Sequence, residues 1–133
     1  MKIYLAGPMR EIPQFNFPAF KEGAEFLRAE GHEVFSPAEH DESTFGKGFA
    51  DDNLTGSEAN AAEKAGLSEI QLRRTLFGAD LNWICKEADA IALLPGWEAS
   101  RGVRAELATA NALGLQVTYL IAREEGGYHW LKD

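Results

Sequence analysis

The feature that most constrains the fold is a run of five apolar residues, Ala90 to Leu94, that Pro95 and Gly96 stop abruptly. A continuous apolar run of this length is typical of a strand buried on both faces, and such strands occur in parallel sheets covered by helices on both sides. The β-branched and apolar run at residues 2–6, ended by Gly7 and Pro8, predicts a second buried strand of the same kind.

Segments with helical spacing separate the predicted strands. A helix is predicted over 18–30, because Phe20, Ala24 and Leu27 fall on one face and Gly31 stands just past the end. Residues 32–36 predict another strand. A capping pair and an apolar face predict a helix over 68–87; the pair is Ser68 with Gln71, and the face is Ile70, Phe77, Leu81 and Ile84. A further helix is predicted from Ser100 through Leu113, and a last strand over 115–122.

Strands that alternate with helices predict an α/β fold with a doubly wound, flavodoxin- or Rossmann-like, mostly parallel sheet flanked by helices. A chain of 133 residues has the length of one ordinary domain, so residues 1–133 are expected to form a single domain. Residues 40–67 are polar and turn-rich, and we expect an irregular excursion there with one short helix. Residues 123–133 are expected to form a C-terminal tail.

The formal charge of −8 argues against binding to a nucleic-acid polymer, because such binding depends on Lys and Arg displacing counterions. A small nucleoside or nucleotide remains compatible with this charge. No apolar run approaches the length of a membrane span, and neither a signal peptide nor a disulfide is expected, Cys85 being the single cysteine. These observations favour a cytoplasmic protein. No metal site and no cofactor are predicted, since the three histidines lack metal-ligand spacing.

In doubly wound sheets, ligands bind beyond the carboxyl ends of the strands. That rule selects two loops, Gly7 to Arg10 and Trp97 to Arg104. The first, with Gly7, Pro8, Met9 and Arg10, is a turn that brings backbone against a ligand, although its spacing matches no phosphate-binding fingerprint. Trp97 in the second either stacks on a base or covers the sheet edge.

The start of the helix at Ser100 is a candidate anion site. Ser100 and Gly102 stand where free backbone N–H groups and the positive end of the helix dipole favour an anion. Arg101 and Arg104 can add charge-assisted hydrogen bonds to a phosphate. The alternative is that Ser100 only caps the helix and that both arginines are solvated.

Three residues are candidates for catalysis. Glu106 lies in the second turn of the helix that starts at Ser100, and its carboxylate can attack an anomeric carbon or stabilise an oxocarbenium-like transition state. Asp80, next to an apolar helix face, can have a raised pKa and donate a proton to a departing base. Tyr4 can orient Glu106 through its hydroxyl group. The alternatives are two solvated carboxylates and a packed tyrosine.

Three segments together resemble the nucleoside 2-deoxyribosyltransferase superfamily, most closely the deoxynucleoside 5′-monophosphate N-glycosidases and the small phage and bacterial deoxyribosyltransferase-like proteins. They are Tyr4 to Arg10, Asp80 to Trp83, and Ser100 to Leu107. The resemblance covers roughly residues 1–39 and 68–122. It implies that Glu106 is the nucleophile, that Asp80 assists the leaving base, that Tyr4 lies near the nucleophile, and that Ser100 and Gly102 contact a phosphate. Arg104 and Ala105 depart from the pattern.

The sequence therefore predicts an enzyme that cleaves or transfers the N-glycosidic bond of a 2′-deoxynucleoside or its 5′-monophosphate. Two other functions remain open, a non-catalytic nucleotide-binding or sensing module and a glycohydrolase acting on a dinucleotide such as NAD. A homo-oligomer, in the form of a dimer, is expected partly from the resemblance and partly because a small α/β sheet leaves apolar surface for a symmetric partner.

Overall fold

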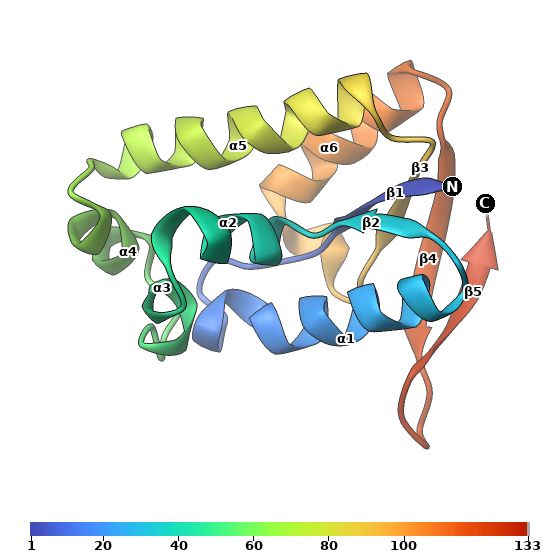
Figure 1. Ribbon diagram of the computed structural model, residues 1–133, viewed down its shortest axis with the longest axis horizontal. Coiled ribbons are helices and arrows are strands. Elements are labelled where there is room, and N and C mark those ends of the chain that lie inside the picture. The colour runs from blue at the N-terminus through green and yellow to red at the C-terminus, as the bar shows by residue number, and fades with distance from the viewer. Residues whose placement is uncertain (133) are drawn as a thin grey trace.

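The computed structural model describes residues 1–132, which form an α/β fold around one five-stranded sheet (Figure 1). The strand order is β2-β1-β3-β4-β5. The strands are β1 (Lys2–Ala6), β2 (Glu33–Phe35), β3 (Ala90–Leu93), β4 (Gln116–Ala122) and β5 (Tyr128–Lys132). The first four are parallel, and β5 pairs antiparallel with β4. The doubly wound, mostly parallel sheet predicted from the sequence is confirmed.

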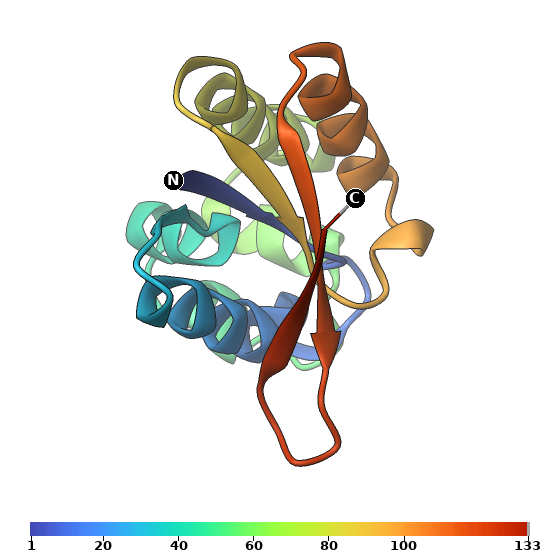
Figure 2. The same cartoon turned by 90° about the vertical axis from the view of Figure 1, so that its right-hand side faces the viewer.

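Helices cover both faces of the sheet (Figure 2). Strand β1 explains why two layers form, because its side chains alternate between the faces. Ile3 and Leu5 pack in the cluster that includes α1 (Phe17–Ala29), whereas Tyr4 and Ala6 pack in the cluster of α5 (Glu69–Lys86) and α6 (Arg101–Ala112). All four side chains are fully buried. The alternation in β1 therefore directs Tyr4 toward the α5 and α6 side.

The helices α1, α5 and α6 form where the sequence predicts them. The capping box of Ser68 and Gln71 is present at the start of α5, and Ser100 caps α6. The predicted apolar face of α5 is wrong at Ile70, which is 47% exposed. The buried residues of α5 are instead Leu72, Asp80 and Ile84, eight and four residues apart, because this side of the helix meets the sheet and the neighbouring helices.

The prediction of an irregular segment over 40–67 is wrong. Three helices lie there: α2 (Pro37–Phe45), α3 (Gly48–Asp51) and α4 (Glu58–Ala65). Pro37 is in the first turn of α2, and Ser57 caps α4 by accepting a hydrogen bond from the Asn60 N–H at 3.2 Å. These polar helices have weak apolar periodicity, and packing of a few small or aromatic side chains holds them against the core.

The expected C-terminal tail forms a β-hairpin in the described residues. Strand β4 turns back at Gly126 and Gly127, which both adopt positive φ angles that glycine tolerates, and β5 then pairs along the edge of β4. Tyr128 is buried at the start of β5 and its ring meets that of Phe26 from α1, with 6.1 Å between ring centroids. The hairpin is thereby anchored to the core.

The strand order reverses between β1 and β3, which are neighbours in the sheet. From β1 the chain continues to β2 on one side, and from β3 it continues to β4 on the other side. At their carboxyl ends, the Leu94 N–H donates to the Ala6 carbonyl at 2.8 Å, and beyond this bond the two chains diverge. Such a reversal point is where ligands bind in doubly wound sheets. No helix among residues 1–132 is long and apolar enough to cross a lipid bilayer.

Candidate active site

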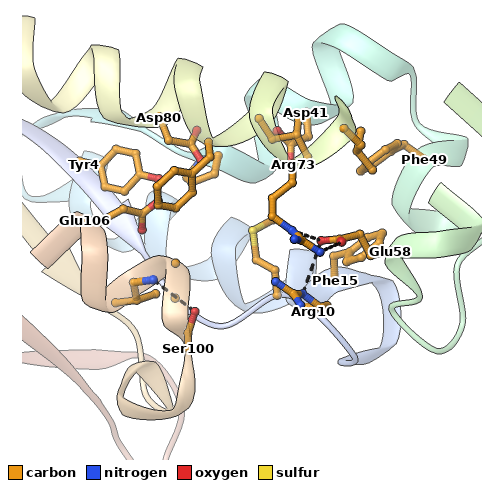
Figure 3. Close-up of a pocket in the computed structure, with 18 residues that line it drawn as sticks. Tyr4, Arg10, Phe15, Asp41, Phe49, Glu58, Arg73, Asp80, Ser100 and Glu106 are labelled. Atoms are coloured by element: carbon orange, nitrogen blue, oxygen red, sulfur yellow. Dashed lines mark hydrogen bonds and ion pairs between the residues drawn. The ribbon is translucent and has the colours of Figure 1, made fainter. Parts of the chain in front are cut away.

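A cavity of about 150 Å³ opens beyond the carboxyl end of β1 (Figure 3). Its walls come from β1, the loop after it, and helices α2 to α6. The lining residues are Tyr4, Gly7, Met9, Arg10, Phe15, Pro37, Asp41, Phe49, Glu58, Leu72, Arg73, Leu76, Phe77, Asp80, Ser100, Gly102, Val103 and Glu106.

Tyr4 and Glu106 are joined by a buried hydrogen bond at the inner end of the cavity. The Tyr4 hydroxyl group donates to Glu106 Oε2 at 2.7 Å. Glu106 faces inward because it shares the buried side of α6 with Val103 and Ala110, and only 6% of it is exposed. The Tyr4 ring stacks on Phe35 with 5.7 Å between centroids. The tyrosine is thus held rigidly by its ring and presents its hydroxyl group to the carboxylate.

Asp80 lies beside this pair. It is on the buried face of α5, one turn before Ile84, and it is 7% exposed. Its Oδ1 atom is buried and accepts no hydrogen bond. A buried carboxyl oxygen without a partner is costly, which makes it a candidate for contact with a ligand.

Asp41 is the third carboxyl group of the cavity, and it was missed in the sequence. It projects from α2, is 3% exposed, and also has an unpartnered buried Oδ1. The signal was present in the sequence, because Pro37 after Ser36 is a helix-start pattern and Ala38 and Asp41 then fall on one face. Reading residues 40–67 as irregular concealed that face.

Burial raises the pKa of all three carboxyl groups. The pKa of Asp41 and that of Glu106 rise to about 8, and the pKa of Asp80 rises to about 7. After burial, the negative charge of Asp80 is the next cause for Asp41 and for Glu106. Hydrogen bonding by Tyr4 acts in the opposite direction and lowers the pKa of Glu106 and that of Asp80. At neutral pH the cluster therefore retains protons, as a donor to a leaving group requires.

We expect the melting temperature to fall by about 5 °C or more between pH 5 and pH 8.5. Carboxyl groups with an ordinary pKa near 4 when unfolded and about 7 to 8 when folded bind more protons in the folded state within this range. Their contribution to stability is therefore complete below about pH 4 and is lost as the pH rises through the folded-state values. Thermal unfolding followed by circular dichroism measures the melting temperature at each pH. The double variant Asp41→Asn with Asp80→Asn should show a smaller change of melting temperature with pH. An unchanged dependence on pH would contradict the raised pKa of these buried carboxyl groups.

Aromatic rings form the opposite wall. Phe15 stacks on Phe49 with 5.5 Å between centroids. Gln14, Phe15 and Asn16 all have φ between 52° and 62°, a region that residues other than glycine rarely adopt. Backbone hydrogen bonds hold this strained turn, among them Gln14 N–H to the Asn53 carbonyl at 2.8 Å. Strain maintained in this way at a cavity is typical of functional sites.

Two arginines and one glutamate stand together at the cavity (Figure 3). Glu58 from α4 accepts the Arg73 side chain through both of its oxygens and lies 3.4 Å from Arg10 Nε. The two arginine side chains are about half exposed, whereas the Glu58 side chain is 16% exposed. Two positive charges against one negative leave this side of the cavity cationic, which favours an anionic substituent of a ligand.

The structure brings together most, but not all, of the predicted substrate-binding residues. Gly7, Met9, Arg10, Ser100 and Gly102 line the cavity. A Cβ atom at Gly7 would come within 2.9 Å of Leu94 Cδ1 and 3.0 Å of Leu94 Cβ, so glycine allows the chain to pass close to the residue that follows β3. At Gly102 a Cβ atom would make only ordinary contact with Phe77.

Four predicted residues lie outside the lining: Pro8, Trp97, Arg101 and Arg104. Trp97, in the short helix η2 (Trp97–Ala99), packs on Tyr119 of the inner strand β4 with 5.7 Å between ring centroids. Arg101 and Arg104 are exposed on α6. The cations that do line the cavity are Arg10 and Arg73, and the latter was not a sequence candidate.

Groups of three or more histidine, cysteine or acidic residues arranged to hold a metal ion are not found in the part of the chain that the structure describes. Asp41, Asp80 and Glu106 therefore share a cavity without forming such a group.

Comparison with known proteins finds one family. Its model, described as a domain of unknown function (DUF4406), matches residues 1–55 and 75–119, more than half of the chain. The matched parts contain Tyr4, Asp41, Asp80 and Glu106, whereas the unmatched residues 56–74 contain Glu58 and Arg73. No curated protein shows significant similarity to the chain.

Proposed function

The chain belongs to the DUF4406 family of domains of unknown function, and from its cavity we propose that it is an N-glycosidase or 2-deoxyribosyltransferase-like enzyme. Its substrate is a 2′-deoxynucleoside or the corresponding 5′-monophosphate. The resemblance of three sequence segments to the nucleoside 2-deoxyribosyltransferase superfamily supports this proposal, since all three segments contribute to one cavity.

One observation carries the proposal: a buried Glu106 held by Tyr4 at 2.7 Å, with Asp80 beside it in a cavity at the strand-order reversal. Glycosidic cleavage by a carboxylate needs a nucleophile aimed at the anomeric carbon and a separate group that carries a proton. The hydrogen bond to Oε2 fixes the direction of Glu106 and leaves Oε1 free to attack. Asp80 supplies the second group.

In the proposed reaction, Glu106 Oε1 attacks C1′ of the sugar. The C1′–N bond breaks, and its electron pair remains on the base, which takes a proton from Asp80. Water or the nitrogen of a second base then attacks C1′, the bond from C1′ to Glu106 breaks, and the proton of the attacking group passes to Asp80. Both carboxyl groups are thereby restored.

We propose separate roles for the two carboxyl groups from the hydrogen bond that the Tyr4 hydroxyl group donates at 2.7 Å. Burial raises the pKa of both groups, to about 7 for Asp80 and to about 8 for Glu106, and a hydrogen bond with Tyr4 lowers both values. The hydroxyl proton of Tyr4, however, is donated to Glu106. A hydrogen bond to a carboxylate stabilises its charged form, and one hydroxyl group serves one acceptor in this way. We therefore assign the charge to Glu106 and the proton to Asp80.

The proposal is tested by incubating the protein with a panel of deoxynucleosides and deoxynucleoside monophosphates, with and without free acceptor bases, and separating the products by chromatography. Release of a free base supports hydrolysis, and a new nucleoside supports transfer. Binding of panel members without products would instead identify a non-catalytic sensing module. Release of nicotinamide from NAD, with no reaction of the panel, would identify a dinucleotide glycohydrolase.

We expect Ser100→Ala to lower kcat/KM for 5′-monophosphates about 10-fold or more and to change that for unphosphorylated nucleosides little. Ser100 lines the cavity and caps α6, and the first backbone N–H groups of a helix are suited to donate hydrogen bonds to an anion. Steady-state kinetics with a matched nucleoside and monophosphate measure the difference.

The control for Ser100→Ala is Ser68→Ala, which removes an equivalent helix cap outside the cavity. It should lower the melting temperature without selecting between the two substrates. An equal effect of Ser100→Ala on both substrates would mean that Ser100 serves only as a cap, through its hydrogen bond from the Val103 N–H at 3.2 Å.

A further inference from the structure

Arg10, Glu58 and Arg73 form an ionic cluster at the end of the cavity away from Tyr4 (Figure 3). The three residues come from the loop after β1, from α4 and from α5. Glu58 lies 3.4 Å from Arg10 Nε, and its two oxygens accept hydrogen bonds from Nε and Nη2 of Arg73. The reaction proposed above uses none of these side chains.

The two arginines keep hydrogen-bond donors that Glu58 does not use. Within residues 1–132, no group accepts a hydrogen bond from Arg73 Nη1 or from either Nη atom of Arg10. A guanidinium group has five N–H donors in a planar fork, so both groups can still bind a phosphate or carboxylate. Two positive charges against one negative charge also leave the cluster positively charged.

The stability of the fold gives little reason for the second arginine. Arg73 already meets both oxygens of Glu58, so the carboxylate is paired without Arg10. Both arginine side chains are about half exposed, and ion pairs in contact with water contribute little to stability. An extra cation at a cavity of a chain with a net charge of −8 is better explained by an anionic ligand.

Helix geometry relates this cluster to the carboxyl groups. Arg73 lies two turns before Asp80 on α5, about 10 Å along the helix axis, and its side chain points away from Asp80 toward Arg10 (Figure 3). Ser100, the N-cap of α6, lies about 9 Å along the axis before Glu106 and stands between Glu106 and Arg10 in the same view. A ligand whose C1′ atom meets Glu106 therefore passes the start of α6 before it reaches the two arginines.

Resting on the proposed function, we propose that Arg10 and Arg73 form a subsite for the β-phosphate of a deoxynucleoside 5′-diphosphate. The helix start at Ser100 receives the α-phosphate, and the free Nη groups of the two arginines donate to the oxygens of the β-phosphate. Arginine suits this role because its planar donors match the spacing of phosphate oxygens. Glu58 holds the guanidinium groups through their Nε atoms, and its negative charge limits how strongly they attract an anion.

The test compares a deoxynucleoside 5′-monophosphate with the 5′-diphosphate of the same base. The measured quantity is the ratio of kcat/KM for the diphosphate to kcat/KM for the monophosphate. Arg73→Gln should lower this ratio about 10-fold or more, because the β-phosphate loses a charged hydrogen-bond donor. Glu58→Gln should raise the ratio about 3-fold or more, since the amide keeps an oxygen for the arginines but removes the opposing charge.

The opposite directions of the two effects separate a ligand subsite from a structural ion pair. Both substitutions weaken the same contact between α4 and α5. A purely structural role would therefore move the ratio in the same direction in both variants or leave it unchanged, and either result would overturn the subsite.

The matched controls are Arg74→Gln on α5 and Glu63→Gln on α4, two exposed positions outside the cavity lining, and both should leave the ratio unchanged. Calorimetric titration with the same two nucleotides measures binding without turnover. Tighter binding of the diphosphate that Arg73→Gln abolishes, with no cleavage of either nucleotide, would support the subsite and contradict the proposed function. Cleavage of both nucleotides with a ratio that neither Arg73→Gln nor Glu58→Gln changes would overturn the subsite alone.

Discussion

Replacing Glu106 with glutamine is expected to lower kcat/KM for glycosidic cleavage by about 10³-fold or more while the fold stays intact. The amide has nearly the same shape and can still accept the hydrogen bond that Tyr4 donates at 2.7 Å. It carries no charge, however, and cannot form a glycosyl ester with C1′. Because Glu106 is 6% exposed and its charge is unfavourable there, the variant should be at least as stable as the unaltered protein.

Product release measured by chromatography, together with thermal unfolding, tests the effect of Glu106→Gln. Glu98→Gln is a suitable control, because it removes a carboxylate from an exposed position of η2 that does not line the cavity. Activity of Glu106→Gln close to that of the unaltered protein would remove this residue from the mechanism. Mass spectrometry of the unaltered protein after rapid quenching should detect the glycosyl adduct on Glu106.

Asp80→Asn is expected to lower kcat by about 10²-fold to 10³-fold, with the largest losses for the poorest leaving bases. Departure of a base that is a poor leaving group depends most on protonation, and asparagine has no transferable proton at this position. Burial raises the pKa of Asp80 to about 7, which suits a proton donor near neutral pH.

A series of deoxynucleosides whose bases differ in acidity tests the role of Asp80. A plot of log kcat against the pKa of the free base should become steeper in Asp80→Asn than in the unaltered protein. Parallel plots would show that Asp80 does not donate the proton and acts on the site in another way. Asp52→Asn, an exposed change outside the cavity, provides the control.

Much of the fold could be predicted from the sequence because its signals are local. Apolar runs stopped by Gly7 or Pro95 indicated β1 and β3, and Ser68 and Ser100 indicated the starts of α5 and α6. The same signals placed Tyr4, Asp80 and Glu106 near one edge of the sheet, since β1, α5 and α6 are all adjacent to the strand-order reversal.

The part of the cavity formed by α2 to α4, Phe15 and Arg73 could not be predicted from the sequence. Tertiary packing, rather than a local sequence pattern, determines where these residues lie. Helices α2 to α4 are short and polar, and their stability depends on contacts that Ala38, Phe49 and similar residues make with distant segments. Phe15 reaches its place through a strained turn that no residue preference predicts. Likewise, Arg73 meets Glu58 only because α4 and α5 lie side by side.

The cavity lining draws on matched and unmatched parts of the chain, and this has an evolutionary consequence. Tyr4, Asp80 and Glu106 belong to segments that the family model matches, whereas Glu58 and Arg73 lie within the unmatched residues 56–74. Mutations in that unmatched stretch can therefore reshape the entrance without disturbing the inner pair joined by the Tyr4 hydroxyl group. We expect related chains to differ in this stretch, and with it in the ionic side chains that it brings to the cavity.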